Sequence, residues 1–243
     1  MKIKTILISS AVLFALSSIP VQAADIAAEP VLNDWTGFYV GVQGGYGWGD
    51  SDSDWEGTGS QTDLNGNSFS IDVDGALLGV QLGADYDLGN GLVIGAVGDI
   101  AWTGIKGKDC ADISNCPVQP PWPLAYGTYD VNWLSTVRGR LGFGHENFLI
   151  YATGGLAIAD ADLKVTNIAG DTPGSDGNTH FGFTIGAGAE YKLSDSVSLG
   201  AEYLYADFGS EHYDLLDVGD GTASVDADLK LHLVKASLNY RFP

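Results

Sequence analysis

Apolar side chains recur at every second position over most of this chain, and this alternation restricts its fold more than any other feature. The first such stretch runs from Phe38 to Trp48, with Val40, Val42 and Tyr46 on the same parity and small or polar residues between them. A two-residue period is that of a β-strand with one apolar face. After the N-terminal segment, no apolar run approaches the roughly 20 residues that a spanning helix needs. A membrane protein with this pattern is expected to be a closed barrel.

The same alternation returns further along the chain. The other strands are expected at 76–86, 92–102, 129–143, 148–158, 181–191, 197–205 and 232–242. Short turns alternate with long polar connections. The long connections are expected at 49–70, 103–128, 160–179 and 209–227. The pattern predicts an all-β fold, an eight-stranded antiparallel up-and-down transmembrane β-barrel with both termini on the periplasmic side.

Aromatic residues on the apolar parity gather near both ends of these strands. Those near the short turns are Phe38, Tyr86, Phe143, Phe148, Tyr191, Tyr240 and Phe242. Those near the long connections are Trp48, Trp102, Tyr129 and Tyr205. Two aromatic rings around an aliphatic band are typical of a membrane barrel and not of a soluble one.

The opposite parity carries glycines and charged residues, which predicts a barrel interior filled by small and ionic side chains. The charged residues of this interior network are expected to be Asp99, Arg138, Arg140, Glu190, Glu202, Lys235 and Arg241. We expect Asp99 to lie near Arg138, and Glu202 near Lys235. Two interpretations follow, a salt-bridged plug or a gate in a narrow pore.

The N-terminal segment has the features of an export signal. Lys2 and Lys4 precede an apolar stretch that ends at Ala23, which predicts a signal peptide over 1–23 and a barrel domain over 24–243. Removing the two lysines changes the formal charge from −20 to −22, which excludes nucleic acid as a partner. In an exported chain the two cysteines, Cys110 and Cys116, are expected to form a disulfide.

No cofactor, metal site or catalytic machinery is expected. Asp50, Asp52 and Asp54 imitate the start of a calcium loop, but Trp55 stands where that loop requires glycine. The histidines share no metal-ligand spacing. Two of them, His180 and His212, fall in expected outer loops. The chain has neither a Gly-x-Ser-x-Gly elbow nor a phosphate-binding loop, so we do not expect an enzyme.

Several strand motifs taken together resemble those of the alphaproteobacterial outer-membrane immunogenic or porin-family proteins, which are similar to the OmpA-like barrel. These motifs span Asp34 to Gly41, Ser135 to Gly142, Tyr151 to Gly155, Gly186 to Tyr191 and Tyr240 to Phe242. The resemblance implies an outer-membrane location, contact with lipid and lipopolysaccharide, and assembly by the barrel-assembly machinery, which reads a terminal aromatic residue. In this chain Pro243 follows Phe242.

Together these features predict a structural protein of the outer membrane that maintains envelope integrity and presents acidic loops for surface interactions. Two alternatives stay open. One is a small low-conductance porin, and the other is a surface protein that binds haem or acts as an adhesin on a host surface. Single-channel recording separates the pore from the structural protein.

Overall fold

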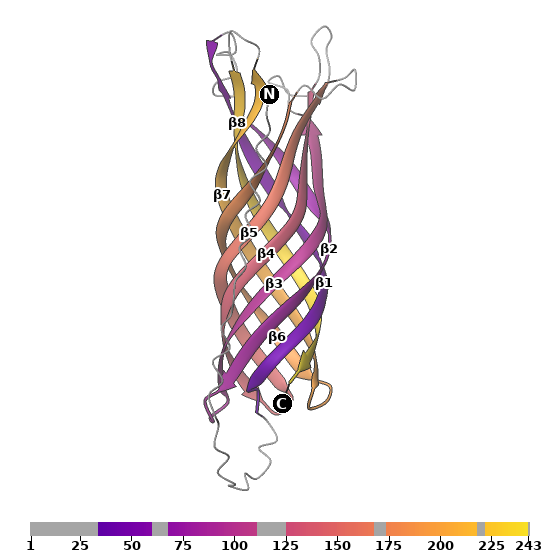
Figure 1. Cartoon of the computed structure of the whole chain (residues 1–243), viewed down its shortest axis with the longest axis vertical. Coiled ribbons are helices and arrows are strands. Elements are labelled where there is room, and N and C mark those ends of the chain that lie inside the picture. Colours follow the sequence, from indigo (N-terminus) through magenta and orange to yellow (C-terminus); the bar gives the residue numbers. More distant parts are fainter. Residues whose placement is uncertain (1–33, 60–67, 111–124, 168–173, 218–221, 243) are drawn as a thin grey trace, which may run out of the picture. The chain divides into compact units, whose positions relative to one another are not determined.

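The computed structural model describes residues 34–59, 68–110, 125–167, 174–217 and 222–242, which form eight antiparallel strands in one closed barrel. The strands are β1 (Gly37–Gly57), β2 (Ser68–Asp87), β3 (Leu92–Cys110), β4 (Ala125–His145), β5 (Phe148–Asn167), β6 (Gly174–Lys192), β7 (Val197–Asp217) and β8 (Thr222–Arg241). Each strand pairs with the next in sequence, and β1 pairs with β8 to close the barrel (Figure 1). The predicted fold class is confirmed.

One end of the barrel, which we call the turn end, carries the short connections. Residues 88–91, 146–147 and 193–196 join β2 to β3, β4 to β5 and β6 to β7 there. In the first of these turns Gly89 and Gly91 have φ values of +85° and +82°, a backbone conformation that glycine adopts without strain. The start of β1 and the end of β8 lie at the same end (Figure 1). We call the opposite end distal.

The half of the barrel nearest the turn end presents an apolar surface, the membrane belt. Phe38 is 72% exposed and Leu82 is 66% exposed, and they belong to a continuous band of exposed large apolar side chains, which marks a surface in contact with lipid. In β1 the belt runs from Phe38 to Trp48, the length of about 9 to 11 residues that a tilted membrane strand needs. Within the described residues, no helix is long and apolar enough to cross a membrane.

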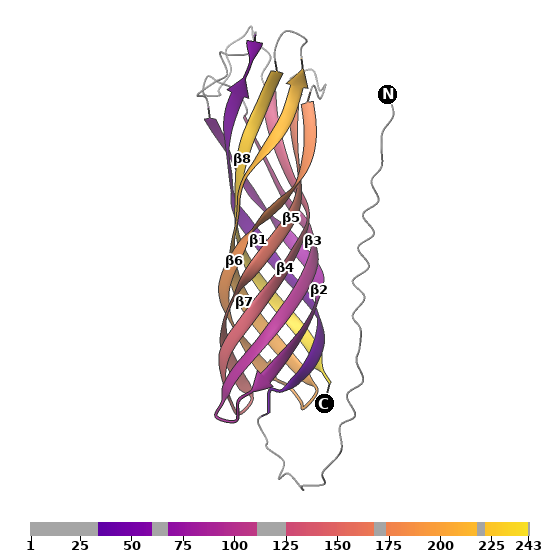
Figure 2. The ribbon, with the colours of Figure 1, turned by 60° about the vertical axis from the view of Figure 1, so that its left-hand side comes forward.

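The strands continue well past the expected ends, so the predicted lengths of the polar connections are wrong. The connections at the distal end are 58–67, 111–124, 168–173 and 218–221. The ends of the strands farthest from the short turns form what we call the distal segment of the barrel (Figures 1 and 2). It comprises residues 50–57, 68–74, 104–110, 125–132, 160–167, 174–180, 206–217 and 222–231.

The strands extend into the distal segment because the alternation continues there with its polarity reversed. In β8 the outward residues Val234 and Leu238 are exposed, but beyond His232 the outward residues are Lys230 and Asp228. The inward residues change from polar to apolar at the same height. Polar outside and apolar inside is the arrangement of a barrel surrounded by water.

The distal segment therefore has a hydrophobic core of its own inside the barrel. Large apolar side chains of this core are almost completely buried; they include Ile71, Val73, Ile105, Leu163, Phe208, Val225, Leu229 and Leu231. The outward surface is rich in carboxylates, because Asp50, Asp52 and Asp54 alternate with the buried Ser51 and Ser53. These three aspartates lie in a strand rather than in a loop.

A β-bulge in β4 reverses the predicted direction of Tyr129. The register between β4 and β5 shifts between Val131 and Trp133, so that one extra residue is inserted. An extra residue exchanges the two faces of a strand with a two-residue period. Tyr129 and Val131 consequently point into the barrel and are buried, and the expected place of Tyr129 in an outer aromatic ring is wrong.

Candidate functional site in the barrel interior

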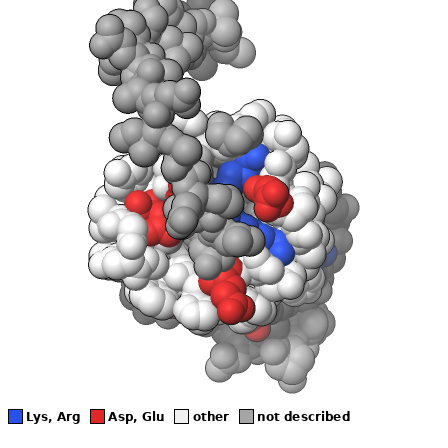
Figure 3. Space-filling view, turned by 90° about the horizontal axis from the view of Figure 1, so that it is seen from below, with Lys and Arg blue, Asp and Glu red and all other residues white. Residues whose placement is uncertain are grey.

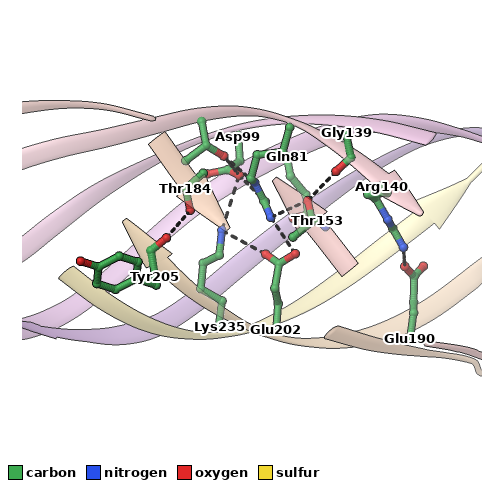
Figure 4. Close-up of polar contacts among 12 residues, drawn as sticks. Gln81, Asp99, Gly139, Arg140, Thr153, Thr184, Glu190, Glu202, Tyr205 and Lys235 are labelled. Atoms are coloured by element: carbon green, nitrogen blue, oxygen red, sulfur yellow. Dashed lines mark hydrogen bonds and ion pairs between the residues drawn. The ribbon is translucent and has the colours of Figure 1, made fainter. Parts of the chain in front are cut away.

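Four charged side chains from four strands meet in the middle of the barrel, and we call them the central cluster: Asp99, Arg138, Glu202 and Lys235. Arg138 lies between the two carboxylates, with Nη2 2.8 Å from Asp99 Oδ2 and Nη1 2.7 Å from Glu202 Oε1. Lys235 Nζ lies 3.5 Å from Asp99 Oδ2 and 3.4 Å from Glu202 Oε2. Figure 4 shows Lys235 reaching between the two carboxylates.

The two neighbour pairs expected from the strand order are both present in this cluster, but they are not independent. Asp99 and Arg138 come from adjacent strands, and Glu202 faces Lys235 directly across β7 and β8. The shortest contact of Glu202 is with Arg138, which joins β4 to β7 across the interior. Adjacency along the sheet cannot reveal a contact of this kind, because it depends on the diameter of the closed barrel.

A second group, the turn-end cluster, lies closer to the short turns and consists of Asp85, Arg140, Glu190 and Arg241. Arg140 Nη2 is 3.0 Å from Glu190 Oε2, and Arg241 Nη2 is 3.0 Å from Asp85 Oδ2. The remaining cross-contacts, Arg140 to Asp85 and Arg241 to Glu190, are 3.7 Å and 3.4 Å long. Ser198 also donates a hydrogen bond of 2.5 Å to Glu190.

Each cluster combines two cations with two carboxylates and is therefore formally neutral. All four side chains of the turn-end cluster are at most 5% exposed, as are Asp99, Arg138 and Lys235. Removing a partner from such a group leaves a charge without compensation in a poorly hydrated interior, which is costly. The predicted network lacks Asp85, although the parity of Asp85 within its strand marks it as inward.

Aromatic side chains fill the interior beside the turn-end cluster. The Arg140 guanidinium lies 3.9 Å from the centre of the Tyr151 ring, and its Nη1 donates a 2.6 Å hydrogen bond to the Tyr39 hydroxyl. Gly188 permits this packing, since a Cβ there would lie 2.5 Å from the Tyr151 hydroxyl oxygen. Small residues on the inward face thus make room for the large ones.

Trp35 occupies the barrel at the turn end. Its side chain is fully buried, and its carbonyl oxygen accepts a 2.7 Å hydrogen bond from Arg241 Nη1. Lys192 Nζ lies 4.5 Å from the centre of the indole and donates a hydrogen bond to the carbonyl of Asp34. Seen from this end, acidic and basic side chains lie next to one another among uncharged residues (Figure 3).

His180 lies inside the distal segment with two tyrosines. Its Nε2 atom is 2.9 Å from the Tyr129 hydroxyl and 2.5 Å from the Tyr213 hydroxyl. Burial lowers the pKa of His180 to about 4, so the ring is neutral at physiological pH. The expectation that His180 stands in an outer loop, where haem could reach it, is wrong, because it belongs to β6 and its side chain is completely buried.

Two expectations concern residues outside the described part of the chain. The signal peptide over 1–23 lies there entirely. Cys110 ends β3, but Cys116 falls in the 111–124 connection, so the disulfide stays a prediction.

A closed antiparallel barrel with an apolar outer belt and an ionic interior defines an outer-membrane barrel protein. The model of the family described as outer membrane protein beta-barrel domain matches residues 10–242, and the chain belongs to this family. It is located in the outer membrane. The resemblance drawn from the strand motifs is thereby confirmed.

Two relatives of known location support the same assignment. The 31 kDa outer-membrane immunogenic protein of Brucella melitensis is 34% identical over 98% of both chains. A 22 kDa outer membrane protein of Rhizobium leguminosarum is 32% identical over 74% of this chain and 68% of its own. Among solved structures, the outer membrane protein OprG of Pseudomonas aeruginosa is 13% identical with a TM-score of 0.48, covering 85% of this chain and 97% of its own.

Proposed function

We propose that this protein is a closed, non-catalytic barrel that reinforces the outer membrane and holds a rigid acidic surface outside the cell. The observation that carries the proposal is the filling of the barrel interior by two neutral ion clusters and, beyond them, by the apolar core of the distal segment. A filled interior favours a structural role over transport, since ions need a hydrated path.

In this proposal the turn end and both termini face the periplasm, and the distal segment stands outside the cell. Its outward charges cannot lie in hydrocarbon, so the strands rise above the bilayer. In β1 the distal part runs from Asp50 to Gly57. At about 3.3 Å per residue and a tilt of about 40°, this part adds roughly 20 Å of height. Lipopolysaccharide would surround it, and a host surface would meet its rim.

One observation favours the alternative of a small pore. Gln43 points inward and is 2% exposed, yet neither polar atom of its amide has a hydrogen-bond partner among the described residues. A buried amide of this kind requires water. A single water molecule at Gln43 would not let ions cross the barrel, but a continuous row of such hydrated sites would.

Recording from planar bilayers that contain the mature protein distinguishes the two functions. We expect no reproducible single-channel steps under conditions in which a general porin, prepared in the same way, conducts. Reproducible steps would favour the pore.

Deletion of the gene tests the structural role separately. We expect the mutant cells to become sensitive to detergent, and unchanged sensitivity would contradict reinforcement of the envelope.

A further inference from the structure

Three strands bring an imidazole and two carboxylates together on the outside of the distal segment. Glu56 of β1, His212 of β7 and Asp226 of β8 each offer one ligand atom, and these atoms lie within 4.8 Å of one another. Among the described residues this is the single group of three such side chains. It lies outside the membrane belt, remote from both ion clusters.

The strand register accounts for this meeting. β8 lies between β1 and β7, and Asp226 is paired with His212 on one side and with Asp54 on the other. Glu56 follows two residues after Asp54 and therefore points to the same face. The register of β7 shifts between Asp207 and Ser210, before His212, and between Asp214 and Leu216, after it. Such bulges re-aim side chains, and here His212 points outward beside Asp226.

Contacts hold the imidazole at both ring nitrogens. Nδ1 of His212 lies 2.7 Å from Asp226 Oδ1, and Nε2 lies 3.4 Å from Asp214 Oδ1. The carbonyl of His212 accepts a 2.6 Å hydrogen bond from Asn178 Nδ2. A metal-bound histidine commonly donates its second N–H to a carboxylate, and Asp214 stands at that position.

We propose that Glu56, His212 and Asp226 bind a first-row divalent metal ion of the Zn²⁺ type, with Asp214 orienting the imidazole from behind. Nδ1 of His212 faces the ion and Nε2–H faces Asp214. Zn²⁺ accepts one imidazole nitrogen and two carboxylate oxygens and leaves a fourth position for water. Mg²⁺ and Ca²⁺ prefer sites made only of oxygen, so the histidine selects against them.

The ligand atoms lie within 4.8 Å of one another, so accepting the ion requires side-chain shifts of up to about 1.5 Å. Ligands at about 2.0 to 2.1 Å from a tetrahedral Zn²⁺ are roughly 3.3 Å apart, so the contact between His212 and Asp226 must open by about 0.6 Å. Glu56 and His212 are exposed, so their side chains have room to rotate. The bound ion would link β1 to β7 across β8.

Titration calorimetry with Zn²⁺ on the folded mature protein in detergent, without a polyhistidine tag, tests the proposal. We expect one saturable site that survives a large excess of Mg²⁺. His212→Gln should weaken binding by more than about 100-fold, and Asp214→Asn by roughly tenfold, since loss of an outer-shell partner typically costs 10- to 100-fold. Gel mobility before and after boiling verifies that each variant is folded.

His145→Gln is the matched control, because it removes another exposed histidine, located in β4 at the turn end. It should leave Zn²⁺ affinity unchanged. Equal binding by the wild type and His212→Gln, or displacement of Zn²⁺ by Mg²⁺, would show diffuse attraction to surface carboxylates and overturn the proposal. Absence of saturable binding by the wild type would overturn it as well. Unchanged affinity in Asp214→Asn would remove Asp214 from the site.

Discussion

At the scale of single residues, the central cluster works as one unit, because Arg138 and Lys235 both contact the same two carboxylates. Its neutrality depends on all four members. A single neutralising change leaves a net charge, whereas a matched pair of changes restores the balance. Partial restoration of stability by the second change is therefore the expected signature of the cluster.

We predict that Glu202→Gln destabilises the folded barrel by roughly 3 kcal/mol and that Lys235→Met has an effect of similar size. The double variant should recover part of this loss, because Arg138 and Asp99 remain paired and no charge is left over. Unfolding titrations in detergent on both single variants and the double variant measure the coupling. Strict additivity would contradict the cluster and strengthen the case for a pore.

The buried His180 makes the stability of the distal segment sensitive to acid. Its pKa is about 4 in the folded protein, against about 6.5 in an unfolded chain. Between pH 4 and pH 6.5 the unfolded state therefore binds more protons than the folded state. The stability that the neutral His180 contributes is fully present above about pH 6.5 and is lost as the pH falls toward 4.

The free energy of unfolding falls as the pH is lowered from 6.5 to 4.5. We predict that it falls less steeply in His180→Gln than in the wild type, by at most about 1.4 kcal/mol per pH unit. Other titrating groups contribute equally to both proteins, so the difference in slope isolates the histidine. Identical slopes for wild type and His180→Gln would show that water reaches the ring.

At the scale of elements, each strand changes its outward character along its length. In β8, Leu238 faces lipid, whereas Asp228 on the same face lies above His232 in the distal segment. This change marks the height of the membrane boundary. It is visible in the sequence as a switch of the apolar residues from one parity to the other, at Leu233 and Val234.

We predict that a membrane-impermeant maleimide added to intact cells labels Asp228→Cys but not Leu238→Cys. Both variants are made in a background with Cys110→Ser and Cys116→Ser, which removes the natural thiols. Labelling of Asp228→Cys only after the outer membrane is permeabilised would contradict the proposed orientation. Labelling of both positions at equal rates would contradict the boundary.

Much of the sheet was predictable from the sequence, because a two-residue period is a local property. The eight strands, their order and the inward parity of Arg138 and Glu202 all follow from it. The strand ends did not follow, because Asp72 and Asp74 look like loop residues when a polar outer face is not expected. The bulge at Val131 leaves no signal in the sequence either, since one inserted residue leaves the apolar pattern on both sides intact.

At the scale of the whole molecule, the barrel needs two surroundings at once. The membrane belt requires lipid or detergent, and the carboxylate-rich distal segment requires water. We predict that the mature protein is β-rich and heat-modifiable in detergent, so that unheated and boiled samples migrate differently on a gel. A monodisperse protein that stays soluble without detergent would contradict the lipid-facing belt.

The acidic distal surface has a consequence for how the barrel reaches its final position. If the distal segment stands outside the cell, the carboxylates of every hairpin must pass through hydrocarbon during insertion. Each ionised aspartate costs about 2.5 to 3.5 kcal/mol at the centre of a bilayer. Spontaneous insertion into an undisturbed vesicle should therefore be slow, and cells would need a catalyst that thins or opens the membrane. The same barrier opposes extraction of the barrel, so an inserted barrel is kinetically trapped in its membrane.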